Sequence, residues 1–106
     1  MPAFIFIYRN PTRYTPTPET SAEMKAWFDG MGGHLAELGK PVDASDTVGN
    51  CSADTTELNG YSIVQAEDLA AALAIAKQCP HLARNGGIEV GVLGEIATAS
   101  QSPCSA

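Results

Sequence analysis

The feature that most constrains the fold is a run of six residues near the N-terminus, Ala3-Phe4-Ile5-Phe6-Ile7-Tyr8, which is apolar throughout. Aromatic and β-branched residues dominate this run, and both types favour extended strands. A strand with one exposed face alternates apolar with polar residues, and this run does not alternate. It therefore predicts a strand that is buried on both faces at the centre of a sheet. The following residues, 9–18, hold three prolines and three threonines and predict a loop that borders a pocket.

The next segment predicts a long amphipathic helix. Thr20 and Glu23 have the spacing of a capping box, with a hydroxyl at the N-cap and a carboxylate three residues later. Apolar residues then recur at helical spacing and form one stripe, consisting of Met24, Trp27, Phe28, Met31, Leu35 and Leu38. Gly39 is the predicted stop. Three glycines at 30–33 lie inside this span and each costs roughly 1 kcal/mol relative to Ala, so they either permit close packing or bend the helix.

The second half of the chain repeats the pattern of strand, helix and strand. Residues 41–57 are weakly patterned and predict only a short exposed strand, carried by Val42, Val48 and Cys51. Residues 58–65 alternate and predict a clear strand. A second helix is predicted to begin after Glu67 and Asp68 and to end at Cys79-Pro80, with a buried stripe of Leu69, Ala72, Leu73 and Ala76. After a turn at residues 85–87, the last strand is predicted from Ile88, Val90 and Val92.

This order, strand-helix-strand-strand-helix-strand, predicts a ferredoxin-like α+β fold with an antiparallel sheet. Two helices cover only one face of such a sheet. The first strand is apolar on both sides, and Ile88, Val90 and Val92 of the last strand are expected to add to the uncovered face. An exposed apolar face of this kind calls for a partner. We therefore expect a homodimer in which two copies pack through their sheet faces.

Length and charge limit the kinds of partner. The 106 residues correspond to one domain, predicted at 1–97 with a flexible tail at 98–106. The net charge is −6, and residues 41–76 hold six acidic side chains but no Lys or Arg. Neither nucleic acid nor a membrane is expected to bind, because both need a basic surface. Three dispersed cysteines and the lack of a secretion signal predict reduced thiols in the cytoplasm, and no cofactor or metal motif is found.

A family resemblance is strongest in residues 60–82. The chain resembles the YCII-related (DGPF, YciI-like) domain family in four runs: Gly60–Leu69, Ala74–Lys77, Cys79–Leu82 and Gly86–Val90. The similarity extends over about residues 3–96, although the Asp-Gly-Pro-Phe motif that names many members is absent from residues 52–57. The resemblance implies a dimeric α+β barrel and no settled activity.

Two histidines, His81 and His34, are the candidate catalytic residues. His81 follows Cys79-Pro80 and either moves protons near neutral pH or caps the end of a helix. His34 neighbours the apolar stripe, where a hydrogen-bonded ring is the alternative. Some YciI-type members are thought to pair a His early in the first helix with an Asp, and His34 does not match that position. The candidate carboxylate partners, with solvated loop acids as the alternative, are Asp43, Asp46 and Asp54.

Tyr8, Arg9 and Tyr61 are the candidate ligand-binding residues. Tyr8 ends the first strand and Tyr61 begins the third, so both hydroxyls are expected at a cleft between sheet and loop. The alternative for each is an aromatic core residue with a satisfied hydroxyl. Arg9 and Arg13 either receive an anionic group or lie at the surface.

Together these features favour a domain that binds a small polar molecule in a cleft at its dimer interface. Simple acid/base chemistry of the lyase or hydrolase type, carried by His81, is the first hypothesis. The alternative is a non-catalytic dimeric module that binds a ligand or a protein through the same surface. The sequence leaves open whether the protein is an enzyme.

Overall fold

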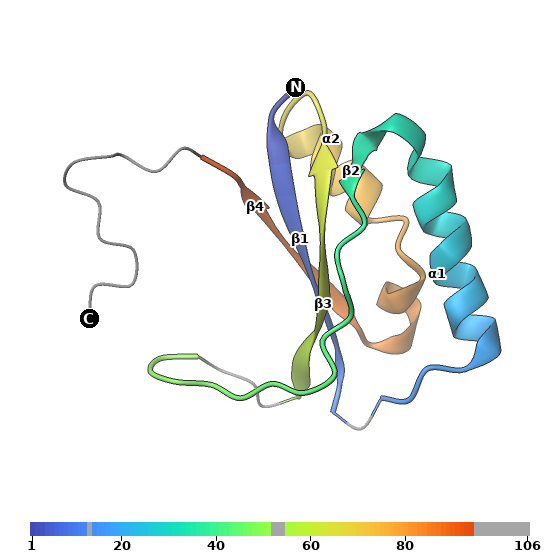
Figure 1. The fold of residues 1–106 in the computed structure, drawn as a ribbon, viewed down its shortest axis with the longest axis vertical. Helices are drawn as coiled ribbons and strands as arrows, with labels where there is room; N and C mark the ends of the chain where they lie inside the picture. Colours follow the sequence, from blue (N-terminus) through green and yellow to red (C-terminus); the bar gives the residue numbers. More distant parts are fainter. Residues whose placement is uncertain (13, 52–54, 95–106) are drawn as a thin grey trace.

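The computed structural model describes residues 1–12, 14–51 and 55–94. Within these residues the chain forms, in order, β1 (Ala3–Pro11), α1 (Pro18–Met31), β2 (Leu35–Glu37), β3 (Thr56–Gln65), α2 (Leu69–Ala76) and β4 (Gly87–Val92). The strands are arranged β2-β3-β1-β4, and each neighbouring pair is antiparallel. Both helices lie on one face of the sheet (Figure 1). The predicted ferredoxin-like α+β fold is confirmed, while the predicted tail at 98–106 lies outside the described residues.

The first strand lies at the centre of the sheet, between β3 and β4, as its apolar sequence predicts. Its side chains alternate between the two faces. Phe4, Phe6 and Tyr8 are buried against the helices and form the centre of the core. Ile5 and Ile7 point to the opposite face and are only half-buried in the single chain. The apolar character of both faces is therefore real, but only one face is covered by the chain itself.

The register of β4 corrects one expectation about the uncovered face. Val92, Val90 and Ile88 stand opposite Phe4, Phe6 and Tyr8 of β1, so they share the helix-covered face. The prediction that they add to the open face was wrong, because the pairing register rather than strand composition decides which side chains face the helices. The half-buried apolar side chains of the open face come from the two central strands, at Ile5, Ile7, Tyr61 and Ile63.

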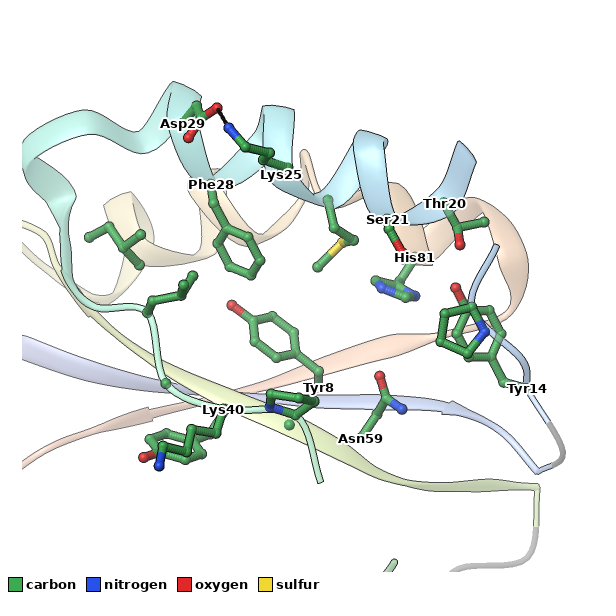
Figure 2. Close-up of a pocket in the computed structure, with 18 residues that line it drawn as sticks. Tyr8, Tyr14, Thr20, Ser21, Lys25, Phe28, Asp29, Lys40, Asn59 and His81 are labelled. Atoms are coloured by element: carbon green, nitrogen blue, oxygen red, sulfur yellow. Dashed lines mark hydrogen bonds and ion pairs between the residues drawn. The ribbon is translucent and has the colours of Figure 1, made fainter. Parts of the chain in front are cut away.

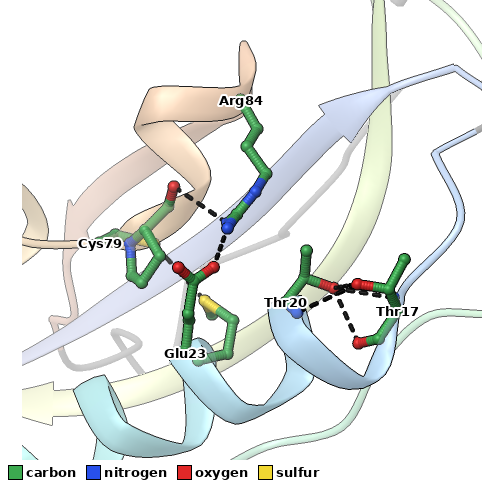
Figure 3. Close-up of polar contacts among 7 residues, drawn as sticks. Thr17, Thr20, Glu23, Cys79 and Arg84 are labelled. Carbon is green, nitrogen blue, oxygen red and sulfur yellow. Dashed lines mark hydrogen bonds and ion pairs between the residues drawn. The ribbon is translucent and has the colours of Figure 1, made fainter.

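The first helix begins earlier than predicted. Thr17 is the N-cap: its hydroxyl accepts a hydrogen bond from the Thr20 backbone N–H (3.2 Å), and the Thr20 hydroxyl accepts one from the Thr17 N–H (2.8 Å) (Figure 3). Thr20 is thus the N3 residue of the capping box rather than its N-cap, and Glu23 is not part of the box. Pro18 fixes this choice, since proline suits the first helical position.

The first helix also ends earlier than predicted, at Met31. Gly32 adopts a φ of +56°, which non-glycine residues rarely adopt, and the chain then makes a short 3-10 turn, η1 (Gly32–His34). The last positions of the predicted stripe lie beyond the helix: Leu35 packs against the core from β2, and Leu38, which follows β2, is exposed. The edge strand is therefore Leu35–Glu37, and the strand predicted from Val42, Val48 and Cys51 is wrong.

Gly39, the predicted helix stop, has a different role. It has a φ of +74°, and a Cβ at this position would overlap the carbonyl group of Tyr61. Only glycine allows the chain after β2 to run this close to β3. Residues 38–41 are thereby held along the edge of the sheet, where Pro41 forms a bridge with Gly60.

The second helix begins as predicted, because the Asp68 side chain caps it by accepting a hydrogen bond from the Ala71 N–H (2.8 Å). Ala72 and Ala76 are buried, but Leu69 and Leu73 are 44% and 39% exposed. Two of the four residues predicted to form the buried stripe are therefore buried, and the two leucines are not. Small alanines let α2 lie close to the sheet, and the larger leucines remain outside. The chain then forms the 3-10 turn η2 (Pro80–Arg84), and Asn85 in the left-handed conformation leads into β4.

Candidate functional site

A hollow lies between α1 and the sheet. Its volume is about 590 Å³, which suits a small organic molecule. One wall is α1, with Met24 and Phe28, and the opposite wall is the sheet, with Tyr8 and Asn59 (Figure 2). Residues 38–41 close one side, and His81 of η2 lies at another. Tyr14 and Pro16, from the predicted pocket-bordering loop, also line this cavity.

Tyr8 enters the cavity wall from β1, because its place in the strand alternation turns it towards the helices. It is 6% exposed, and Trp27 and Phe28 pack edge-to-face against its ring, with centroids 6.0 and 6.1 Å away. Its buried hydroxyl has no hydrogen-bond partner among the described residues. Burial raises the pKa of Tyr8, so the phenol stays protonated and keeps a hydrogen to donate.

His81 reaches the cavity from η2 and is 5% exposed. Its Nδ1 atom is buried without a hydrogen-bond partner among the described residues, and the Tyr14 ring lies edge-on, with centroids 5.5 Å apart. Burial lowers the pKa of His81 below its usual 6.5, so the imidazole is neutral at pH 7. The site therefore offers a neutral ring that can accept or donate a hydrogen bond.

Contacts between η2 and α1 hold His81 in place. Arg84 forms an ion pair with Glu23 and lies 3.5 Å from the Pro80 carbonyl oxygen (Figure 3). The Cys79 sulfur lies 3.8 Å from the sulfur of Met24, which lines the cavity. Burial raises the pKa of Cys79, so this residue is a protonated thiol that packs rather than a nucleophile. The Glu23 carboxylate, predicted as a capping group, thus helps to position the histidine.

Two asparagines belong to the site and were not identified from sequence. Asn10 is fully buried at the end of β1, and its side-chain amide donates a hydrogen bond to Asn59 Oδ1 (2.6 Å). Asn59 lines the cavity. The Oδ1 atom of Asn10 is buried with no partner among the described residues. In the sequence, Asn59-Gly60 is equally consistent with a tight turn and with the start of a strand. Only the pairing of β1 with β3 places the Asn59 amide beside the cavity.

Charged groups lie only at the rim of the cavity. Lys25 and Asp29, one helical turn apart on α1, pair at 2.9 Å and are both exposed, and Lys40 is exposed as well. Of the predicted carboxylate partners of His81, Asp43 and Asp46 are exposed and do not line the cavity, and Asp54 lies outside the described residues. No three metal-ligating side chains gather in the described part of the chain.

The remaining predicted residues are only partly brought together. Tyr61 borders the cavity, but its hydroxyl donates to Glu37 (3.2 Å), and this contact raises the pKa of Tyr61. Arg9 donates to the side-chain and backbone oxygens of Thr56, both at 2.9 Å, and does not line the cavity; Arg13 lies outside the described residues. His34 is exposed, with Nδ1 2.8 Å from the Gln65 carbonyl oxygen, and lines a smaller hollow beside Trp27.

The fold and the cavity define a class: a small α+β domain with helices on one side of an antiparallel sheet and a cavity beneath the first helix. The family model of the YCII-related domain matches residues 1–95, and the chain therefore belongs to the YCII-related family. No curated protein and no solved structure matches the chain. None of the helices in the described residues has the length and apolar character needed to cross a bilayer.

Proposed function

We propose that this YCII-related domain binds a small molecule in the cavity between α1 and the sheet. One observation carries the proposal: the wall of a mostly apolar cavity holds two buried polar side chains, Tyr8 and His81, with polar atoms that have no partner among the described residues. Leaving such a group unpaired costs about 1–3 kcal/mol. A ligand that pairs with them recovers this cost, which is how polar groups in apolar sites provide specificity.

A titration followed by ¹H–¹⁵N NMR tests this proposal. The probe is 2-acetylnaphthalene, a flat apolar molecule with one carbonyl group. We expect its addition to shift the backbone amide signals of Phe28, Gly39 and Gly60, which line the cavity. The amides of Glu89 and Leu73, which do not line it, serve as internal controls. Equal shifts in both sets, or none in the first, would contradict a site at this cavity.

Proton transfer by His81 is the second candidate function, and the neutral state of the buried imidazole favours it. A neutral imidazole in an apolar site can take a proton from a weakly acidic C–H bond next to a carbonyl group. The ring then becomes an imidazolium beside the enolate left behind, so the pair carries no net charge. Return of the proton to carbon completes the cycle.

Deuterium exchange separates catalysis from binding alone. In D₂O, breaking a C–H bond of the acetyl group of 2-acetylnaphthalene and returning a deuteron replaces its methyl hydrogens. General-base catalysis typically contributes about 10²–10⁴-fold, so we expect exchange at least about a hundredfold faster with the wild type than with His81→Asn. His34→Asn is the matched control, since this histidine lies outside the cavity. Binding without exchange would identify a non-catalytic ligand-binding module.

We also infer that a second copy of the chain covers the open face of the sheet. Ile5, Ile7 and Ile63 form an apolar surface there, with no helix over it (Figure 1). Light scattering should give twice the chain mass of 11.1 kDa. Ile7→Lys is expected to halve the measured mass, whereas Leu73→Lys, on the exposed side of α2, is expected to leave it unchanged. A wild-type mass of one chain would refute the dimer.

A cytoplasmic location is part of the same proposal. Cys51 and Cys79, the two cysteines in the described residues, are free thiols, which fits a reducing compartment. Cys51 is exposed and so accessible to reagents. Labelling of Cys51 in intact cells by a maleimide that cannot cross membranes would contradict this location.

A further inference from the structure

The charges around the cavity limit what its interior can hold. Lys25, Asp29 and Lys40 are its charged side chains, all are exposed, and the first two already pair with each other. The deeper wall offers only neutral groups, Tyr8 and His81 among them. An ion placed there would lose its hydration without gaining a counter-ion, which is strongly unfavourable. The part of a ligand that reaches this wall is therefore uncharged.

The Tyr8 hydroxyl sets a second requirement. It is buried and makes no hydrogen bond to the described residues, because the nearby Ser62 hydroxyl donates to the Leu38 carbonyl oxygen instead. Its neighbours on α1 are the rings of Trp27 and Phe28. A hydrogen-bond donor held among apolar groups selects an oxygen or nitrogen acceptor on the ligand. The same donor discriminates against an otherwise identical hydrocarbon, which would leave it unpaired.

We propose that the cavity selects an uncharged ring compound with a carbonyl oxygen, and that this oxygen accepts a hydrogen bond from the Tyr8 hydroxyl. The apolar lining, with Met24, Phe28 and Leu35, packs against the ring, and Tyr8 makes the polar contact. This assignment rests on the proposed function, that the cavity binds a small molecule. It adds the chemical class of the ligand and identifies Tyr8 as the residue that recognises its carbonyl oxygen.

Three naphthalenes of nearly equal shape test the assignment: 2-acetylnaphthalene has a carbonyl, 2-ethylnaphthalene has no oxygen, and 2-naphthoate is an anion. Dissociation constants come from the NMR titration. A hydrogen bond contributes about 0.5–1.5 kcal/mol net, so the ketone is expected to bind up to about tenfold more tightly than the hydrocarbon. The naphthoate is expected to bind at least tenfold more weakly than the ketone.

Tyr8→Phe then assigns the preference to one hydroxyl. This variant is expected to lose the preference, so that the ketone binds no more tightly than the hydrocarbon. Thr47→Val is the control, because it removes an exposed hydroxyl that does not line the cavity, and it is expected to keep the wild-type preference. A normal ¹H–¹⁵N spectrum establishes that each variant is folded.

The outcomes distinguish this inference from the function on which it rests. If none of the three compounds shifts the signals of the cavity, the binding function itself fails and the assignment fails with it. If the naphthoate or the hydrocarbon binds as tightly as the ketone, the cavity binds ligands but the assigned class is wrong. If Tyr8→Phe still prefers the ketone, another group donates the hydrogen bond to the carbonyl oxygen, and the role assigned to Tyr8 is wrong.

Discussion

The two faces of the sheet are built from the same two central strands and have different environments. On one face, Phe4, Phe6 and Val64 are almost completely buried beneath the helices. On the other face, Ile5 and Ile7 alternate with these residues and remain half-exposed in the single chain. The comparison shows that one strand sequence can be apolar on both sides for two reasons. One side forms the core of the domain, and we propose that the other forms the contact with a second copy.

The covered face is not uniformly packed. Towards its Trp27 side, aromatic rings fill the space between α1 and β1, with Phe6 and Trp27 stacked at 6.3 Å between centroids. Around Tyr8 and His81 the helix and the sheet leave a cavity. Here the wall holds polar atoms that the core does not satisfy. One part of this face thus stabilises the fold, and we propose that the other part binds a ligand.

The largest expected effect distinguishes the two faces by stability. Phe6→Ala should lower the free energy of unfolding by about 3–5 kcal/mol, the usual cost of removing a buried aromatic side chain. Ile7→Ala should cost less, roughly 1–2 kcal/mol at low protein concentration, since its side chain is only partly buried in the single chain. Urea unfolding measures both values.

Protein concentration sharpens this first prediction. In a dimer that buries the open face, the loss caused by Ile7→Ala should grow as the concentration rises, because more of the wild type is then stabilised by its partner. The loss caused by Phe6→Ala should not depend on concentration in this way. A cost for Ile7→Ala that is the same at all concentrations would place the open face outside any dimer contact.

A pair of glycines tests how the wall of the cavity is held on the covered side. Gly39→Ala should destabilise the fold by about 1–3 kcal/mol, because the new Cβ would overlap the Tyr61 carbonyl at a positive φ. Gly30→Ala should stabilise it by up to about 1 kcal/mol, since Gly30 lies in α1 with open space around it. Thermal unfolding compares the two variants. A neutral Gly39→Ala would mean that residues 38–41 are not fixed against β3.

The periodicity of the sequence was sufficient to predict the topology. Strand patterns and helical spacing repeat regularly enough that the order of elements follows, and the position of β1 follows from its apolar run. The end of α1 could not be predicted in the same way. Leu35 continues the helical spacing of the stripe, and it also faces the core from β2. The positive φ of Gly32 ends the helix and so places Leu35 in a strand rather than in α1. The composition of the segment does not reveal this backbone angle.

Part of the site was also accessible from the sequence. Tyr8, Tyr61 and His81 were predicted from their places at the ends of elements, and all three border one cavity, although their roles remain predictions. Arg9 was predicted as a group that receives an anion and His34 as a titratable ring beside the apolar stripe, and both lie elsewhere. Asn10 and Asn59 were missed because their contact depends on the register between two strands that lie far apart in the sequence.

The smallest expected effect concerns the pH dependence of stability that arises from the buried histidine at the cavity wall. Because burial lowers the pKa of His81, the unfolded chain binds a proton more readily than the folded chain as the pH falls through 6.5. Stability from this residue is therefore complete above about pH 6.5 and decreases below it. The slope from a single proton cannot exceed about 1.4 kcal/mol for each pH unit.

Urea unfolding between pH 5 and pH 8 measures this slope. His81→Asn should flatten it, since the variant has no imidazole to protonate. A flat profile in the wild type, or the same slope in His81→Asn as in the wild type, would show that the imidazole at the cavity wall is not held neutral. The cavity that holds the Tyr8 hydroxyl would then also hold a charged group, and an anion would become the better ligand.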